Sequence, residues 1–156
     1  NADPDQWWTF SATPGFADDP ASNFHLPVSS TDIAGRTSWV EHDRYDLLGV
    51  SVTNPAGQAV RAINDYRLLA PRMVRDINGN WSAARHDAFG RPVSVAIMGK
   101  IETAGVRTGY EPCEGDNLTN PTQQFVYDLD AFVRSGRPIS AHTIAFENHR
   151  FSGGDR

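Results

Sequence analysis

The chain has 156 residues, enough for one domain with a hydrophobic core, and a formal net charge of −5. Its 14 basic residues are scattered singly, which excludes the basic stripe of a nucleic-acid-binding protein and a polybasic membrane segment. No run approaches the roughly 18 apolar residues of a membrane-spanning helix. The first residues also lack the basic and apolar parts of a signal peptide. Plentiful Gly and Pro, with four Trp and eight Phe, favour an all-β, turn-rich protein.

Residues 1–23 combine aromatic side chains with Pro and Gly, and we expect a lead-in to the sheet here. One short strand, Gln6–Ser11, is expected, followed by an irregular loop. The pair Trp7 and Trp8 is expected to pack on the end of a sheet, and sugar binding by exposed rings is the alternative.

Residues 24–100 contain a repeat with a period of 22 residues. Three markers recur at this interval: the glycines Gly35, Gly57 and Gly79, the turn openers Asp32, Asn54 and Asp76, and the aspartates Asp43, Asp65 and Asp87. Internal periods in the twenties are typical of units that stack on copies of themselves. We therefore predict an all-β fold in which antiparallel β-hairpin repeats of about 22 residues form a strip.

Turn chemistry predicts where these strands begin and end. Asp or Asn bonds its own backbone and Gly supplies a positive φ, so Asp87 and Gly90 are expected to form a turn like those of the three copies. The expected strands are Phe24–Thr31, Thr37–His42, Leu47–Thr53, Ala59–Ile63, Arg72–Arg75, Trp81–His86 and Pro92–Met98. Alternation of Val with Ser or Thr at 50–53, and a similar pattern at 93–96, predicts one buried face and one wetter face.

The remaining chain divides at residue 122. Residues 101–122 lack periodicity and exceed an ordinary connection, so we expect a long irregular loop that is an insertion, a surface loop or partly disordered. In 123–156 we expect a strand at Gln124–Tyr127, a turn or short helical turn at Asp128–Val133 and a longer strand at Pro138–Asn148. The opening NADPDQWW and the tail Phe151–Arg156 both resemble cut ends of a longer chain.

The sequence predicts no catalytic, cofactor-binding or metal-binding residue. The repeated aspartates could serve acid–base chemistry or a calcium ladder, but their spacing favours a role in turns. The histidines lack zinc-like spacing, and they are His25, His42, His86, His142 and His149. Cys113 with a histidine is the enzymatic alternative. Asn80-Trp81-Ser82 and Asn117-Leu118-Thr119 match the glycosylation acceptor pattern, which matters only in a eukaryotic secretory route.

The residues singled out are therefore structural turn positions: Asp32, Gly35, Asn54, Gly57, Asp76, Gly79, Asp87 and Gly90. The copies that contain them resemble Rhs/YD repeats, although only Tyr127-Asp128 keeps the Tyr-Asp pair. Four segments are similar to the B component of bacterial Tc insecticidal toxin complexes, at the start of its Rhs-repeat region. They are Phe24–Gly35, Arg44–Gly57, Asn64–Lys100 and Phe125–Phe132.

This resemblance implies a non-enzymatic role in a secreted bacterial toxin complex. In that family the Rhs region winds a β-strip into a hollow shell that encloses the toxic part of a partner until delivery. The implied partners are other parts of the same parent chain and a C-type toxin component, with no cofactor, no nucleic acid and no membrane span. The alternative is a small β-rich carbohydrate-binding module that uses Trp7, Trp8, Trp39 and Trp81.

Overall fold

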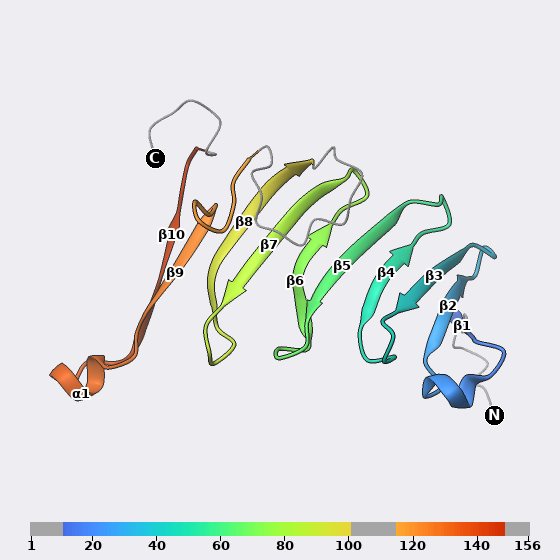
Figure 1. Cartoon of the computed structure of the whole chain (residues 1–156), viewed down its shortest axis with the longest axis horizontal. Helices are drawn as coiled ribbons and strands as arrows, with labels where there is room; N and C mark the ends of the chain where they lie inside the picture. The colour runs from blue at the N-terminus through green and yellow to red at the C-terminus, as the bar shows by residue number, and fades with distance from the viewer. Residues whose placement is uncertain (1–10, 101–114, 149–156) are drawn as a thin grey trace, which may run out of the picture. The chain divides into compact units, whose positions relative to one another are not determined.

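The computed structural model describes residues 11–100 and 115–148. Their strands form one antiparallel sheet in which every strand lies beside its neighbours in sequence, in the order β1 to β10 (Figure 1). The strands are β1 (Ala12–Phe16), β2 (Pro27–Asp32), β3 (Thr37–His42), β4 (Gly49–Thr53), β5 (Ala59–Asp65), β6 (Ala70–Arg75), β7 (Asn80–His86), β8 (Pro92–Lys100), β9 (Gln123–Asp128) and β10 (Ser140–Ala145). The predicted all-β strip of antiparallel hairpins is confirmed.

Helical structure is limited to two short pieces in the described residues. A 3-10 helix, η1 (Pro20–Asn23), precedes β2, and a single-turn helix, α1 (Ala131–Ser135), joins β9 to β10. Gly136 ends α1 with a φ of +67°, and its N–H donates to the Phe132 carbonyl at 2.8 Å. A short helical turn was expected at Asp128–Val133, and it begins three residues later. The chain divides into two compact units, residues 1–61 and 62–156.

The first strand was missed by the sequence prediction, which placed an irregular loop here. Residues 1–10 lie outside the described part, so Gln6–Ser11 is described only at Ser11, which is not in a strand. β1 contains Pro14 and Gly15, and both read as loop residues. Among the described strands β1 pairs with β2 alone, and an edge strand tolerates a proline, which lacks an N–H. A Cβ on Gly15 would collide with Ser29 Oγ, so this glycine lets β1 approach β2.

Three other predicted strands are too long at their ends. The strand expected at Phe24–Thr31 begins at Pro27, because Phe24 and His25 adopt left-handed φ values of +53° and +56°. The strand expected at Leu47–Thr53 begins at Gly49, because the Asp43 N–H bonds the Leu48 carbonyl and extends the preceding turn. The strand expected at Pro138–Asn148 is confined to Ser140–Ala145.

The sheet in residues 11–61 has one more buried face and one more exposed face, and the serines lie on the more buried one. Ser29 and Ser51 are 9% and 6% exposed, whereas Val52 is 48% exposed. Ser29 lies opposite Trp39 on β3, and Trp39 lies opposite Thr53 on β4, so these residues share the serine face. The more buried face here therefore carries small hydroxyl side chains, and the valines face outward.

The described core lies in residues 62–156, on one face of β6, β7 and β8. Met73, Ala83 and Ala96 form a row of directly opposed residues across these three strands. With Met98 and Leu118 they make one buried cluster, against which Ile63 and Trp81 pack. Small alanines in the row leave room for Leu118, which is only 6% exposed. The core is thus closed by a segment that the sequence pattern did not assign to any element.

Residues 115–122 are clamped to β8 by a ring of hydrogen bonds. The Asp116 N–H donates to the Ile97 carbonyl at 3.0 Å, and the Ile97 N–H donates to Thr122 Oγ1 at 2.8 Å. The Thr122 hydroxyl then donates to Asp116 Oδ2 at 2.7 Å, and Asp116 is 1% exposed. For 115–122 the surface-loop expectation is wrong, because these backbone bonds and Leu118 hold the segment on the sheet. The rest of the expected loop, 101–114, lies outside the described residues.

Candidate functional site

Four tight turns with the same backbone geometry connect strands of the sheet. They begin at Asp32, Asn54, Asp76 and Asp87. In each, the N–H of the first residue donates to the carbonyl of the fifth at 2.9–3.0 Å, and the glycine N–H donates back to the first carbonyl at 2.9–3.1 Å. The glycines have φ values of +76°, +77°, +88° and +82°, which L-residues with a Cβ rarely adopt. Gly at the fourth position therefore sets where each hairpin reverses.

The first side chain of each turn acts as a latch on its own backbone. Its Oδ1 accepts the N–H groups of the third and fifth residues, at 2.8–3.0 Å in all four turns. Asp32 Oδ2 also accepts Arg36 Nε at 2.8 Å, and Asp87 Oδ2 accepts Arg91 Nε at 2.8 Å. In the third turn the donor to this second oxygen is an amide: Asn80 Nδ2 donates to Asp76 Oδ2 at 3.0 Å. These side chains thus satisfy donors that the turn leaves unpaired.

The turn at Asn54 is a neutral version of the same latch. Its second side-chain atom is a donor, so Asn54 Nδ2 gives a hydrogen bond to Gln58 Oε1 at 2.9 Å. The fifth residue of this turn, Gln58, therefore accepts with its side chain, whereas Arg36 and Arg91 donate in the turns at Asp32 and Asp87. This exchange shows that the geometry depends on complementary hydrogen bonding and does not require a charge.

The latching bonds lower the pKa of the three turn carboxyls. For Asp32 the largest cause is the hydrogen bond from the Arg36 backbone N–H, followed by the Arg36 side chain. For Asp76 it is the hydrogen bond from the Asn80 side chain. For Asp87 the largest effect is desolvation, which raises the pKa, but the hydrogen bonds from Arg91 and Phe89 together outweigh it. All three carboxylates are therefore favoured in the folded chain.

We expect acid to remove this stabilisation. Because the folded pKa values lie below the unfolded value of 3.8, the contribution is present above about pH 4 and is lost as pH falls through the folded values. Urea midpoints should be level between pH 7 and about pH 5 and should fall towards pH 3. Asp76→Asn should reduce this fall, because Asn80 can turn its amide as Gln58 does opposite Asn54. An equal acid loss in Asp76→Asn and the parent chain would contradict the latch.

The turns at the other two repeated aspartates are built differently. Asp43 Oδ1 still accepts two backbone N–H groups, from Tyr45 at 3.1 Å and Leu47 at 3.0 Å. The left-handed position is filled by Asp46 in that turn and by Leu69 in the turn after Asp65, with φ values of +54° and +53°. Asp tolerates this conformation through local hydrogen bonds, whereas Leu does so at some cost. The repeated aspartates Asp43, Asp65 and Asp87 therefore all begin turns, but only the turn at Asp87 has a glycine in the left-handed position.

One arginine joins two of these turns in residues 62–156. Arg67 Nη1 donates to the carbonyls of Asp87 at 2.9 Å and Ala88 at 3.1 Å, and a Cβ built on Gly90 would lie 3.0 Å from Leu68 Cδ2. Arg91 in turn lies over the Tyr127 ring, 4.8 Å from its centroid. Contacts of this kind fix one turn against the next along the edge of the strip. No sequence signal marked Arg67, because its partners are backbone carbonyls.

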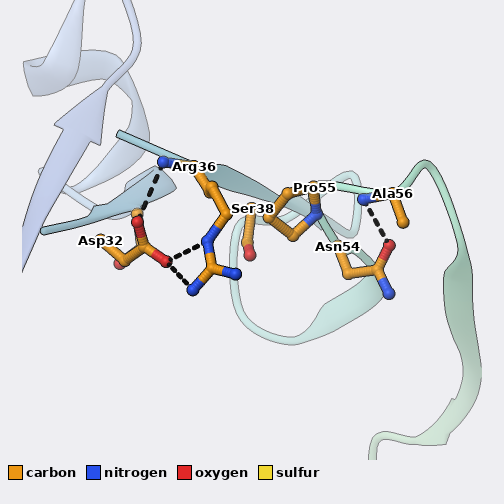
Figure 2. A pocket seen from close by; sticks show the side chains of 7 residues that line it. Asp32, Arg36, Ser38, Asn54, Pro55 and Ala56 are labelled. Atoms are coloured by element: carbon orange, nitrogen blue, oxygen red, sulfur yellow. Dashed lines mark hydrogen bonds and ion pairs between the residues drawn. The ribbon is translucent and has the colours of Figure 1, made fainter. Parts of the chain in front are cut away.

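A shallow hollow of about 570 Å³ lies between the turns at Asp32 and Asn54. Figure 2 shows the Asp32–Arg36 ion pair on one side and Asn54, Pro55 and Ala56 on the other. Its lining is Ser30, Asp32, Arg36, Ser38, Asn54, Pro55 and Ala56. Trp39 is 55% exposed but points to the opposite face, because its neighbour Ser38 lines the hollow and successive strand residues alternate. The hollow thus has no aromatic platform.

The described residues form no site for the two alternatives from the sequence, carbohydrate binding by tryptophans and catalysis by Cys113 with a histidine. Trp81 packs against the core, and Trp7, Trp8, Cys113 and His149 lie outside the described part. Across 11–100 and 115–148, no group of three His, Cys, Asp or Glu side chains could hold a metal ion. No described helix is long and apolar enough to cross a membrane. Of the two glycosylation patterns, Asn117 is 5% exposed and Asn80 Nδ2 is bound to Asp76.

A turn with two buried polar side chains, those of Asp116 and Asn117, was also missed by sequence reasoning. Asp116 and Asn117 fold 117–120 into a turn, in which Asn117 Oδ1 accepts the N–H groups of Thr119 and Asn120 at 2.9 Å. The sequence did contain a turn signal, because an Asn followed a few residues later by a Pro is typical of a turn, and here these are Asn117 and Pro121. The local sequence could not show that this turn is buried against β8.

Comparison with known proteins rests on structure, since no protein-family model and no curated protein matches the sequence. The crystal structure of TcdB2-TccC3 superposes with a TM-score of 0.68 and 18% identity, over 86% of this chain. The structures of TcdB2-TccC3-TEV and TcdB2-TccC3-Cdc42 give TM-scores of 0.58 and 0.57, at 19% and 18% identity, over 76% and 81% of this chain. The chain has the fold of a stretch of the Tc toxin Rhs-repeat proteins in these structures.

The likeness is to a small part of those proteins. This chain covers 7%, 6% and 7% of the three chains that it matches. The shared part is the antiparallel strip itself, and the Asp-x-x-Gly turns are the features that repeat along it in this sequence. The resemblance to a Tc toxin Rhs-repeat protein therefore stands on the fold as well as on the sequence segments.

Proposed function

We propose that this chain is a non-enzymatic segment of the wall of a toxin-complex shell, which encloses a toxic polypeptide for delivery outside the cell that makes it. The observation that carries the proposal is the ten-stranded strip in chain order, in a chain of which 86% matches a stretch of the TcdB2-TccC3 structure. The partners proposed are further strands of the same parent protein and a C-type toxin component. The compartment proposed is an extracellular toxin complex.

The exposed edge of the sheet supports this proposal. β10 pairs with β9 through six residue pairs without a bulge, and all six of its residues are exposed. It carries no Pro, Lys, Arg, Asp or Glu, and such residues are among those by which isolated sheets protect their edges. Such a strand is suited to continue a sheet, which is what one segment of a wound strip must do.

The chemistry of the turns supports the non-enzymatic part of the proposal. The carboxylates of Asp32, Asp76 and Asp87 are all engaged by their own turn backbone and by the fifth residue of the turn. An acid–base group must be free to exchange a proton with a substrate. Their repetition follows from the repetition of the hairpin.

Protection of the toxic polypeptide from protease tests the proposal. The full-length protein that carries this chain would be co-produced with its toxic partner component and digested, and the partner would be followed on gels. We expect the toxic polypeptide to survive in the complex and to be degraded when Met98→Asp opens the wall, because Met98 is 1% exposed. Ile97→Asp is the matched control, since Ile97 is 54% exposed on the other face. Equal digestion with and without the shell protein would refute encapsulation.

A further inference from the structure

The turn that begins at Asp76, the third of the four glycine turns, differs from the other three at the residue before its glycine. That residue is Asn78, whereas the equivalent residues are Ala34, Ala56 and Phe89. Asn78 is exposed, and within the described residues only its backbone N–H has a partner, Asp76 Oδ1 at 2.9 Å. Its side-chain amide is therefore available to the peptide nitrogen that follows it. Gly79 offers that nitrogen without a Cβ to obstruct the approach.

A cation lies close to Gly79. A Cβ built on Gly79 would meet Arg75 Nη2 at 3.3 Å and Arg75 Nε at 3.8 Å. Nothing lies within 4 Å of the equivalent position at Gly35 or Gly57, and Gly90 meets only an apolar side chain, Leu68. A guanidinium this close favours loss of a proton from the Gly79 amide, since it stabilises the negative charge left on nitrogen.

We propose that Asn78-Gly79 is a site of spontaneous backbone modification, promoted by Arg75. The Gly79 nitrogen loses its proton to water and bonds to the Asn78 side-chain carbon. The bond from that carbon to Nδ2 breaks, and Nδ2 leaves as ammonia after taking up a proton, which closes a succinimide ring. Water then opens the ring at either carbonyl, giving aspartate or isoaspartate. The net reaction consumes one water and releases one ammonia, with no oxidant or reductant.

The folded turn restrains this reaction and is damaged by it. The Gly79 N–H donates to the Asp76 carbonyl at 3.0 Å, so the nitrogen reacts only while this one hydrogen bond is broken. Isoaspartate places an extra methylene in the main chain between Asn78 and Gly79. The Asp76 latch cannot then keep both its 2.9 Å bond to the Asn78 N–H and its 2.8 Å bond to the Asn80 N–H. Modification therefore loosens the hairpin of β6 and β7.

Peptide mapping by mass spectrometry tests the proposal on the intact chain. The protein would be held at mildly alkaline pH, and conversion at Asn78 would be compared in the parent chain and in Arg75→Gln. We expect Arg75→Gln to slow conversion about fivefold, the effect of one unit charge at about 4 Å in water. Arg75→Lys keeps the charge and should keep most of the rate. Because Arg75 is exposed, neither change should unfold the chain, and thermal unfolding checks this.

A neighbouring turn provides the matched comparison. Ala56→Asn places the same Asn-Gly pair in the turn at Asn54, where no side chain lies within 4 Å of the Gly57 Cβ position. Its conversion should match that of Asn78 in the Arg75→Gln variant. Absence of conversion at Asn78, or equal rates at both turns with no effect of Arg75→Gln, would overturn the proposal. Equal conversion at Asn117, which is not followed by glycine, would also overturn it.

Discussion

Met98→Ala is expected to lower the free energy of unfolding by about 2–5 kcal/mol. Met98 is 1% exposed and belongs to the cluster of Met73, Ala83, Ala96 and Leu118. Alanines fill much of that cluster, so its walls cannot move inward to fill the space that the lost thioether would leave. Met98 also lies opposite Trp81, which packs on the same cluster.

The adjacent residue is the control for this prediction. Ile97→Ala removes a similar apolar area from a side chain that is 54% exposed on the opposite face, and it should cost less than about 1 kcal/mol. Its backbone bonds to Asp116 and Thr122 are unaffected by the change. Urea unfolding monitored by Trp fluorescence measures both variants. Similar losses for the two would mean that the core does not lie on the face that carries Met98.

Gly115→Ala is expected to cost about 3 kcal/mol, from a strained backbone and from overpacking together. Gly115 has a φ of +88°, and a Cβ built there would lie 3.0 Å from the Ile97 carbonyl oxygen and 3.2 Å from the Gly99 nitrogen. Both neighbours are backbone atoms of β8, which cannot turn aside as a side chain can. The change would therefore push 115–122 away from the core.

A second glycine separates the two causes. Gly57 has a similar φ of +77° but has nothing within 4 Å of its Cβ position. Gly57→Ala should therefore cost only about 1 kcal/mol, from backbone strain alone. The difference between the two variants measures the contact with β8. Equal losses, determined by urea unfolding of both proteins, would show that 115–122 is not held against that strand.

The repeat could be predicted from the sequence because its turns are local. An Asp or Asn latch and a glycine with positive φ act within five residues, so Asp32, Asn54, Asp76 and Asp87 each carry their own signal. The order of strands follows from such turns, since short connections join neighbours in a sheet. The strand Thr37–His42 was accordingly placed with its observed ends.

The features that were missed depend on contacts distant in sequence. β1 contains Pro14 and Gly15, and only its place at an edge beside Ser29 makes it a strand. Segment 115–122 has the composition of a surface loop, and only its bonds to Ile97 bury it. The Val–Ser alternation indicated two faces of the sheet but not which face is buried. Ser94, for example, is fully buried, and Gln124 lies opposite it on β9. Pairing partners decide such cases, and a single strand does not reveal them.

The most direct test of the account is an electron cryomicroscopy map of the full-length protein that carries this chain, in complex with its toxic partner component. We expect β1 to β10 to appear in chain order within a continuous β-wall, with a further strand on β10 and partner density on one side only. A closed, separate domain with β10 exposed to solvent and no enclosed density would contradict the shell.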